Sequence, residues 1–497
     1  MSPARRSASR RFWRRARAAR SPGSGRRRWR PASGSRSITS ASSRVSGRAR
    51  PARPGRSAAS APTSYWRRSG PRRSRAATRS PGPFSACRWR RGTPSRASAS
   101  PACSPSPRAA RAEGAAMALD DTHPALEDLR RRARRRLPRF VWEYLDSAAG
   151  DESAARLNRD ALDATRLTPR SLRGVSAPDP ATRLMGRDHP LPFGIAPVGM
   201  SGLIWPDAER ILARLAARER IPYGLSTVAS RTPEEVGPHV GDQGWFQLYP
   251  PGDAEIRADM LRRARDAGFH TLILTVDVPA PARRERQRRA RLTSPMRLTP
   301  RIAAEAALAP EWALRTLRMG TPRFRTLDAY VREEKAMSST AHVGYLLRVA
   351  PDWRYLAALR EAWDGKLVVK GVLDPDDARR SAAEGADAVW VSNHGGRQFA
   401  AAPPALAALP DMRAAVPAGT PVIFDGGVRS GTDILRAVAL GADFVMLGRA
   451  FHWGLAAFGA RGAAHAVHIL REELKADMSQ LGCATLADVR SITVGTS

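Results

Sequence analysis

The chain has 497 residues, of which 42% are hydrophobic, and a formal net charge of +37. No stretch reaches the roughly 18 consecutive apolar residues that a membrane-spanning helix needs, so we expect a soluble or at most peripheral protein. Of the cysteines Cys87, Cys103 and Cys483, only the last lies outside the basic N-terminal segment. The rest of the chain therefore cannot form an internal disulfide, which suits a reducing, cytoplasmic compartment.

The positive charge is concentrated at the N-terminus. Residues 1–116 contain 30 arginines, no lysine and one acidic residue, Glu113. The rest of this segment is mainly Ser, Ala, Pro and Gly without apolar periodicity. It cannot bury enough surface to offset its ordering entropy, so we predict a disordered extension.

Three interpretations of this extension compete. It could be a nucleic-acid-binding arm, a long Arg- and Ser-rich transit peptide, or the product of a misassigned start. GC-rich codons yield Arg, Ala, Gly and Pro in any frame, and the stretch MALDDTHPALEDL from Met117 resembles a natural start. We favour the third interpretation and expect no nucleic-acid partner.

From about residue 188, short apolar runs alternate with amphipathic segments. Continuous apolar runs of this length are typical of strands buried on both faces of a parallel sheet. The runs cover residues 191–200, 221–230, 244–250, 271–279, 366–373, 388–396, 421–428 and 444–450. Helical segments with acidic starts and glycine stops include 207–220, 254–268, 374–386 and 431–442. Eight such units predict an α/β fold, a closed (β/α)8 TIM barrel with an N-terminal helical cap, over residues 117–497.

The active site of this fold forms at the C-terminal ends of the strands and in the loops that follow them. Gly, Asn and Asp are common there for turn chemistry alone, whereas Lys370, His394 and Tyr249 need another reason. Each such residue is by itself more often structural, but together on one rim they predict a site. The strand-end candidates are Pro197, Gly199, Ser226, Gln247, Tyr249, Thr275, Asp277, Lys370, His394, Arg397, Asp425, Gly426, Gly427, Val428, Arg429, Gly448 and Arg449.

The last two units carry a more specific pattern. A glycine pair, Gly426 and Gly427, follows the seventh predicted strand, and Gly448 with Arg449 follows the eighth. These loops are the usual phosphate cradle of such barrels, because glycine lets backbone N–H groups approach an anion at a helix start. A phosphate-bearing cofactor is therefore predicted. It is not a Rossmann dinucleotide, because no G-x-G-x-x-G opens a helix after a strand here.

The stretch SNHGGRQ at residues 392–398 resembles the signature of the FMN-dependent α-hydroxy-acid oxidase and dehydrogenase family, which includes glycolate oxidase, L-lactate dehydrogenase and (S)-mandelate dehydrogenase. The resemblance runs from about residue 123 to the C-terminus and includes FQLY, DGGVRSGTD and LGRA. Bacterial mandelate dehydrogenase-like members look most similar. The resemblance implies FMN-dependent oxidation of a lactate- or mandelate-like (S)-2-hydroxy acid to the 2-oxo acid, commonly by a homotetramer.

The resemblance also implies roles for single residues. His394 would be the catalytic base, held by Asp277, and no metal would take part. Tyr144, Tyr249, Arg284 and Arg397 would bind the substrate, with Tyr249 also counted as catalytic. The FMN would contact Pro197, Val198, Gly199, Ser226, Gln247, Thr275, Lys370, Ser392, Asp425, Gly426, Gly427, Val428, Arg429, Gly448 and Arg449.

Two positions bear on substrate and electron acceptor. Val228 stands where plant glycolate oxidase has tryptophan, which suggests a substrate larger than glycolate. Gly199 stands where glycolate and lactate oxidases have alanine, which favours a dehydrogenase with a quinone-type acceptor. An oxidase that uses O2 and produces hydrogen peroxide is the alternative.

Residues 283–365 form a long connection between the fourth and fifth predicted strands, and the resemblance implies a lid there. Its stretch at 301–319 is basic and amphipathic, which predicts either peripheral contact with the inner face of the cell membrane or a helix packed on the barrel. Two other FMN barrels are disfavoured. An inosine-monophosphate dehydrogenase would need a cysteine in a barrel loop, and a type 2 isopentenyl-diphosphate isomerase would lack the pair His394 and Arg397.

Overall fold

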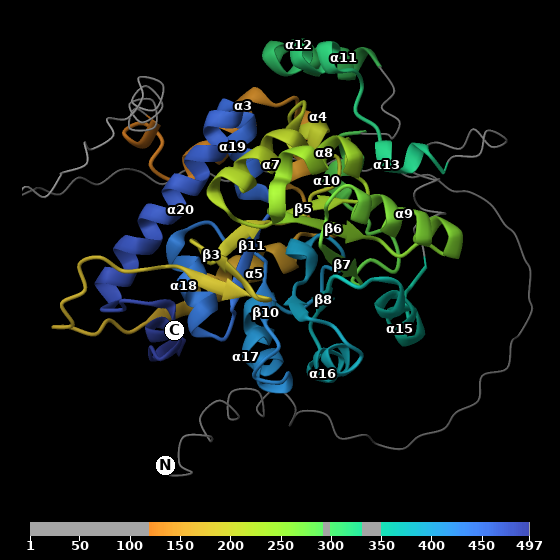
Figure 1. Cartoon of the computed structure of the whole chain (residues 1–497). Helices are drawn as coiled ribbons and strands as arrows, with labels where there is room; N and C mark the ends of the chain where they lie inside the picture. The colour runs from red at the N-terminus through yellow and green to blue at the C-terminus, as the bar shows by residue number, and fades with distance from the viewer. Residues whose placement is uncertain (1–118, 292–298, 331–348, 497) are drawn as a thin grey trace, which may run out of the picture. The chain divides into compact units, whose positions relative to one another are not determined.

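Eight parallel strands close into a barrel in the computed structural model of the protein, which describes residues 119–291, 299–330 and 349–496 (Figure 1). In order they are β4 (Phe193–Ile195), β5 (Tyr223–Ser226), β6 (Gly244–Leu248), β7 (Thr271–Thr275), β8 (Lys366–Val372), β9 (Ala388–Val391), β10 (Val422–Phe424) and β11 (Phe444–Leu447). Each pairs in parallel with the next, and β11 closes the ring on β4, where Met446 lies opposite Gly194. All eight predicted apolar runs are confirmed as strands, and so is the barrel. The predicted disordered extension, residues 1–116, lies outside the described residues.

Helices follow the strands around the barrel (Figure 1). They are α6 (Ser201–Ile204), α7 (Ala208–Glu219), α8 (Pro233–Val240), α9 (Ala254–Asp266), α15 (Trp353–Ala362), α16 (Pro375–Ala383), α17 (Ala405–Ala415), α18 (Gly431–Ala439), α19 (Arg449–Phe458) and α20 (Ala460–Leu481). Several begin where the sequence places a cap: the side chains of Asp253, Asp374 and Ser430 accept hydrogen bonds from backbone N–H groups of α9, α16 and α18. The four predicted helical segments are confirmed.

The N-terminal helical cap is also present. It consists of α3 (Leu126–Arg136), α4 (Arg139–Asp146) and α5 (Ser153–Ala164), followed by β1 (Thr165–Leu167), which pairs antiparallel with β12 (Val494–Thr496) after the short α21 (Leu486–Arg490). The hairpin of β2 (Thr182–Leu184) and β3 (Arg187–His189) places Leu184 among the side chains of the barrel interior.

In the described part of the connection between β7 and β8, four further helices precede α15. They are α10 (Glu285–Arg289), α11 (Pro300–Ala307), α12 (Pro310–Met319) and α13 (Arg325–Asp328). The amphipathic stretch therefore forms two helices, because Pro310 has no N–H to donate and takes the first turn of α12. No helix in the described ranges is long and apolar enough to cross a membrane.

The barrel interior is a separate apolar cluster. Its buried side chains are Leu184, Ala196, Trp245, Ile273, Val368, Ala388, Trp390, Ile423, Phe444 and Met446. Side chains alternate between the two faces of a strand, so Lys370, two residues after Val368, also points inward, one step nearer the C-terminal rim. Apolar side chains therefore fill the barrel interior below Lys370, and the candidate site begins above them.

Candidate active site

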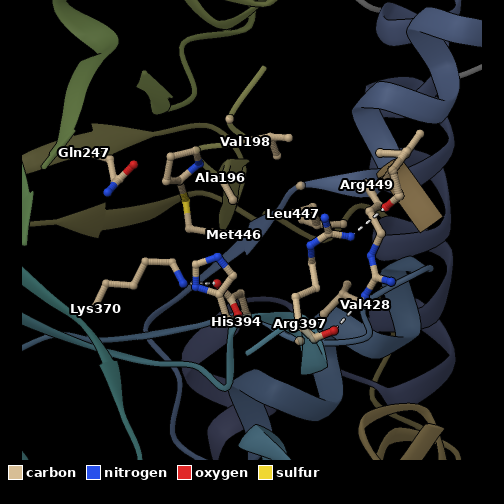
Figure 2. A pocket seen from close by; sticks show the side chains of 18 of the residues that line it. Ala196, Val198, Gln247, Lys370, His394, Arg397, Val428, Met446, Leu447 and Arg449 are labelled. Atoms are coloured by element: carbon tan, nitrogen blue, oxygen red, sulfur yellow. Dashed lines mark hydrogen bonds and ion pairs between the residues drawn. The ribbon is translucent and has the colours of Figure 1, made fainter. Parts of the chain in front are cut away.

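One pocket opens at the C-terminal ends of the strands and collects most of the predicted residues (Figure 2). Those that line it are Tyr144, Pro197, Val198, Gly199, Gln247, Tyr249, Thr275, Arg284, Lys370, His394, Arg397, Asp425, Gly426, Gly427, Val428, Arg429, Gly448 and Arg449. Figure 2 shows Lys370 and Gln247 on one side of it and Val428 and Arg449 on the other. Ser226, Asp277 and Ser392 do not line it, and each hydrogen-bonds to a residue that does.

His394 and Asp277 form a pair at the pocket wall. The Nδ1 atom of His394 lies 3.0 Å from Oδ1 of Asp277, which follows β7. Burial raises the pKa of Asp277, but the charge of His394 and its hydrogen bond, together with the charge of Lys370, bring that pKa below its ordinary value. The carboxylate is thus charged and fixes the hydrogen on Nδ1. In that tautomer Nε2 carries no hydrogen.

Backbone conformation explains the two glycines between His394 and Arg397. The chain turns directly after β9, with positive φ angles of 57° at His394, 62° at Gly395 and 77° at Gly396. A Cβ on Gly396 would lie 2.5 Å from the backbone N of Ala155 on α5. Glycine is therefore required here both by conformation and by space.

A pair of amides holds this turn against α5. The Nδ2 atom of Asn158 donates to Oδ1 of Asn393 at 2.8 Å, and Nδ2 of Asn393 donates to Oδ1 of Asn158 at 2.8 Å. Oδ1 of Asn393 also accepts from the N–H of Gly396. Sequence reasoning missed Asn158, since one asparagine on an amphipathic helix carries no sign of a partner more than 200 residues away.

Lys370 is buried in a small polar network. Its Nζ atom lies 2.9 Å from Oδ2 of Asp425 and donates to Oγ of Ser392 at 2.8 Å. Ser392 in turn donates to Oδ1 of Asp425 at 2.6 Å and accepts from the backbone N–H of His394. One hydroxyl thus connects the lysine, the aspartate and the histidine turn.

Unpaired buried donors on the same side of the pocket as Lys370 indicate a polar ligand. Oε1 of Gln247 accepts from Ser226 at 2.8 Å, but Nε2 of Gln247 and Oγ1 of Thr275 have no partner within the described residues. Buried polar groups are normally hydrogen-bonded. Both residues line the pocket, and FMN carries carbonyl and ring-nitrogen acceptors along one edge, so these donors fit that group.

The far end of the pocket suits a phosphate. Gly448 is the N-cap of α19 and makes no side-chain cap, while Gly426 and Gly427 have positive φ angles of 125° and 84°. Burial lowers the pKa values of Arg429 and Arg449, so an anion beside them would stabilise their charges.

The neighbouring helix α18 is less available to an anion. The carboxylates of Asp433 and Glu473 already accept from the backbone N–H groups of Arg429 and Gly431, at 2.8 and 2.7 Å. The start of α19 is thus the better anion site of the two predicted loops.

Three of the predicted substrate residues donate hydrogen bonds to backbone carbonyls around the pocket. The Tyr144 hydroxyl donates to the carbonyl of Gly199 at 2.8 Å, and Nε of Arg284 donates to the carbonyl of Arg397 at 3.1 Å. The Arg397 guanidinium donates to the carbonyls of Tyr144, Leu145 and Ser147, at 2.9, 3.2 and 2.5 Å. Arg397 therefore also fastens the C-terminal end of α4.

Other lining residues had no chemical motif to mark them. They are Leu145, Ala196, Val228, Gly395, Met446, Leu447, Ala450 and Trp453. Of these, only Val228 and Gly395, the latter within the SNHGGRQ stretch, had attracted attention from the sequence. The inward alternation of β11 would have identified Met446.

A barrel that gathers a histidine–aspartate pair, buried cations and two glycine-containing loops around one pocket is the arrangement expected of an enzyme with a phosphorylated cofactor. The model of the FMN-dependent dehydrogenase family matches residues 133–495. The chain belongs to this family, and FMN is its cofactor.

Individual relatives agree with this. L-lactate dehydrogenase of Xanthobacter autotrophicus is 38% identical over 366 residues, which cover 73% of this chain and 94% of that protein. (S)-mandelate dehydrogenase of Pseudomonas putida is 35% identical over 364 residues, covering 73% and 92%. The crystal structure of the monotopic membrane protein (S)-mandelate dehydrogenase superposes with a TM-score of 0.70 at 34% identity, covering 75% of this chain and 99% of that one. Mandelate oxidase with (S)-4-hydroxymandelic acid gives a TM-score of 0.65 at 34% identity, covering 75% and 99%.

Proposed function

We propose that the protein oxidises an (S)-2-hydroxy acid to the 2-oxo acid, with His394 as the base. The observation that carries this proposal is the contact of 3.0 Å between Asp277 and Nδ1 of His394, which leaves Nε2 to receive a proton in the pocket. The Asp277 carboxylate stabilises the imidazolium that forms, whether the proton leaves the hydroxyl or the α-carbon.

Arginines and tyrosines orient the substrate. Burial and the neighbouring charge of Arg284 lower the pKa of Arg397, so a carboxylate bound between the two guanidinium groups relieves an unfavourable accumulation of charge. The planar guanidinium holds a carboxylate in two places, which fixes the α-carbon relative to His394. Tyr144 and Tyr249 line the same part of the pocket and are assigned to the carboxylate and the hydroxyl.

The remaining predicted residues hold the cofactor. FMN held here would supply the acceptor for the two electrons of the oxidation. Pro197, Val198 and Gly199 support its ring, Gln247 and Thr275 donate to its polar edge, and Lys370 supplies positive charge there. Ser226 and Ser392 do not line the pocket and would orient Gln247 and Lys370 through hydrogen bonds. The loop of Asp425 to Arg429 and the start of α19 at Gly448 and Arg449 take the ribityl chain and phosphate.

The relatives named above favour a lactate- or mandelate-like substrate. Val228 leaves no room for a side chain at position 199, because a Cβ on Gly199 would lie 2.6 Å from Cγ2 of Val228.

For the electron acceptor we propose a quinone-type compound, as in a dehydrogenase. An O2-using oxidase is the second candidate, because the solved mandelate oxidase is almost as similar. The homotetramer that the resemblance implies stays a prediction.

A panel of glycolate, lactate, longer 2-hydroxy acids and both enantiomers of mandelate tests the function. We expect the yellow protein to be bleached without oxygen by (S)-2-hydroxy acids larger than glycolate, because His394 and the arginines would hold the substrate in one orientation. Slow reoxidation by air and fast reoxidation by a soluble quinone would support the dehydrogenase. Stoichiometric hydrogen peroxide would establish the oxidase, and no bleaching by any 2-hydroxy acid would contradict the proposal.

We also propose that α11 and α12 contact the membrane surface peripherally. Ile302 and Trp312 are buried, and the indole N–H of Trp312 donates to the carbonyl of Leu203 at 2.9 Å. The opposite side leaves Leu308, Leu314 and Leu317 at 83%, 49% and 80% exposed, beside the exposed Arg315 and Arg318. Apolar side chains flanked by arginines suit an interface with anionic lipids, and one solved relative is a monotopic membrane protein.

Vesicle co-sedimentation measures this contact. The double variant Leu314→Ser, Leu317→Ser should lower binding to anionic phospholipid vesicles at least about tenfold, because each leucine loses about 1.5–3 kcal/mol of burial in the interface. Leu157→Ser removes an exposed leucine on α5 and should leave binding unchanged. Equal binding by all three proteins would contradict the proposal.

A further inference from the structure

A tryptophan lies against the buried ammonium of Lys370. Lys370 on β8 and Trp390 on β9 are register neighbours in the parallel pair, so both side chains point into the barrel. Nζ of Lys370 lies 4.9 Å from the centroid of the Trp390 ring. Their exposed fractions are only 4% and 0%. A cation over the face of an indole is attracted by the ring quadrupole, most strongly where water is excluded.

The contacts of Lys370 leave one direction open. Asp425 and Ser392 take two sides of the ammonium, at 2.9 and 2.8 Å, and the Trp390 ring covers a third. An ammonium has three N–H donors, and Lys370 lines the pocket. The remaining donor is therefore available to a group in the pocket.

Packing alone does not explain a tryptophan at this position. Its Nε1 is buried and has no hydrogen-bond partner in the described part of the chain. A buried unpaired N–H destabilises a fold by about 1–3 kcal/mol, and a smaller apolar side chain would avoid that cost. The aromatic face toward Lys370 gives the tryptophan a role that an aliphatic residue would lack.

We propose that Trp390 is a positioning residue for Lys370. Asp425 and Ser392 already hold the ammonium at 2.9 and 2.8 Å, and the ring covers a further side of it, so that the remaining N–H is directed into the pocket. The charge is thereby directed at the polar edge of FMN and raises the reduction potential of the cofactor, since a nearby cation favours the more negative reduced form. This inference rests on the proposed placement of Lys370 beside the FMN.

The test measures the two-electron reduction potential of bound FMN against a reference dye, in the full-length protein loaded with FMN. Trp390→Met removes the ring and keeps a buried apolar side chain, and Trp390→Phe keeps a weaker ring. We expect the ratio of reduced to oxidised FMN at a fixed dye potential to fall about tenfold in Trp390→Met, or about 30 mV for a two-electron couple, and about threefold in Trp390→Phe.

The chain offers a matched control in Trp245, a buried tryptophan of the same interior cluster whose register neighbours are Gly224 and Thr271 rather than a lysine. Trp245→Met and Trp245→Phe should leave the potential unchanged. Equal potentials in the two Met variants would overturn the proposal. If Trp390→Met takes up no FMN, the Phe pair decides in the same way.

Lys370→Met separates this inference from the proposed function. If it lowers the potential while both Trp390 variants match their Trp245 controls, only the role of Trp390 is wrong. If Lys370→Met leaves the potential unchanged, Lys370 does not act on the cofactor, and that part of the proposed function fails together with the inference.

Discussion

His394→Gln should keep FMN bound and slow its reduction by the 2-hydroxy acid by at least about 10³-fold. Glutamine occupies similar space but cannot accept the proton, and a positioned base contributes about 10²–10⁴-fold by itself. The Asp277 carboxylate, no longer paired with an imidazole, adds to the loss. Single-turnover reduction without oxygen, followed by flavin absorbance, isolates this step from reoxidation.

A second histidine–aspartate pair provides the control. His468 on α20 lies 3.5 Å from Asp120 and is not among the residues of the pocket. In His468→Gln, the 2-hydroxy acid should reduce the bound FMN at the same rate as in the unmodified protein. Fast reduction in His394→Gln would refute the assignment of the base.

Arg397→Lys should lower kcat/KM by at least about 10³-fold and also lower the melting temperature. The guanidinium donates to three carbonyls at the end of α4 and faces the pocket, which a compact ammonium cannot reproduce. Loss of two charge-assisted hydrogen bonds of about 1.5–3 kcal/mol each accounts for that magnitude. Because α4 carries Tyr144, both kcat and KM should change.

Substrate kinetics and thermal unfolding measure the two effects separately. Arg156→Lys, at an exposed arginine of α5 paired with Asp151, should change neither. A lowered melting temperature with unchanged kcat/KM would show that Arg397 serves only the fold and does not bind the substrate.

Much of the architecture followed from the sequence for a simple physical reason. Strands of a parallel barrel are covered on both faces, so each leaves a short continuous apolar run, and chemistry-bearing residues stand where the runs end. This located all eight strands and most of the polar and glycine residues that line the pocket. The amphipathic stretch at 301–319 forms two helices, since Pro310 starts a new one.

The sequence could not resolve which polar residues reach the cavity. Ser226 and Gln247 are register neighbours on β5 and β6, and the longer amide lines the pocket while the hydroxyl stays behind it. Which of the two side chains reaches the cavity depends on the register between the strands, and the sequence of one strand does not give that register. The Asn158–Asn393 pair and the Lys370–Trp390 contact depend in the same way on closure between distant segments.

Closure of β11 onto β4 has a consequence for synthesis of the protein. The register Met446↔Gly194 joins segments about 250 residues apart, and such distant pairing is slow to form because the loop entropy must be overcome first. A nascent chain that has not reached residue 447 lacks β11, the last strand of the barrel. FMN uptake should therefore begin only after residue 447 has left the ribosome, and cofactor supply cannot guide the early stages of folding.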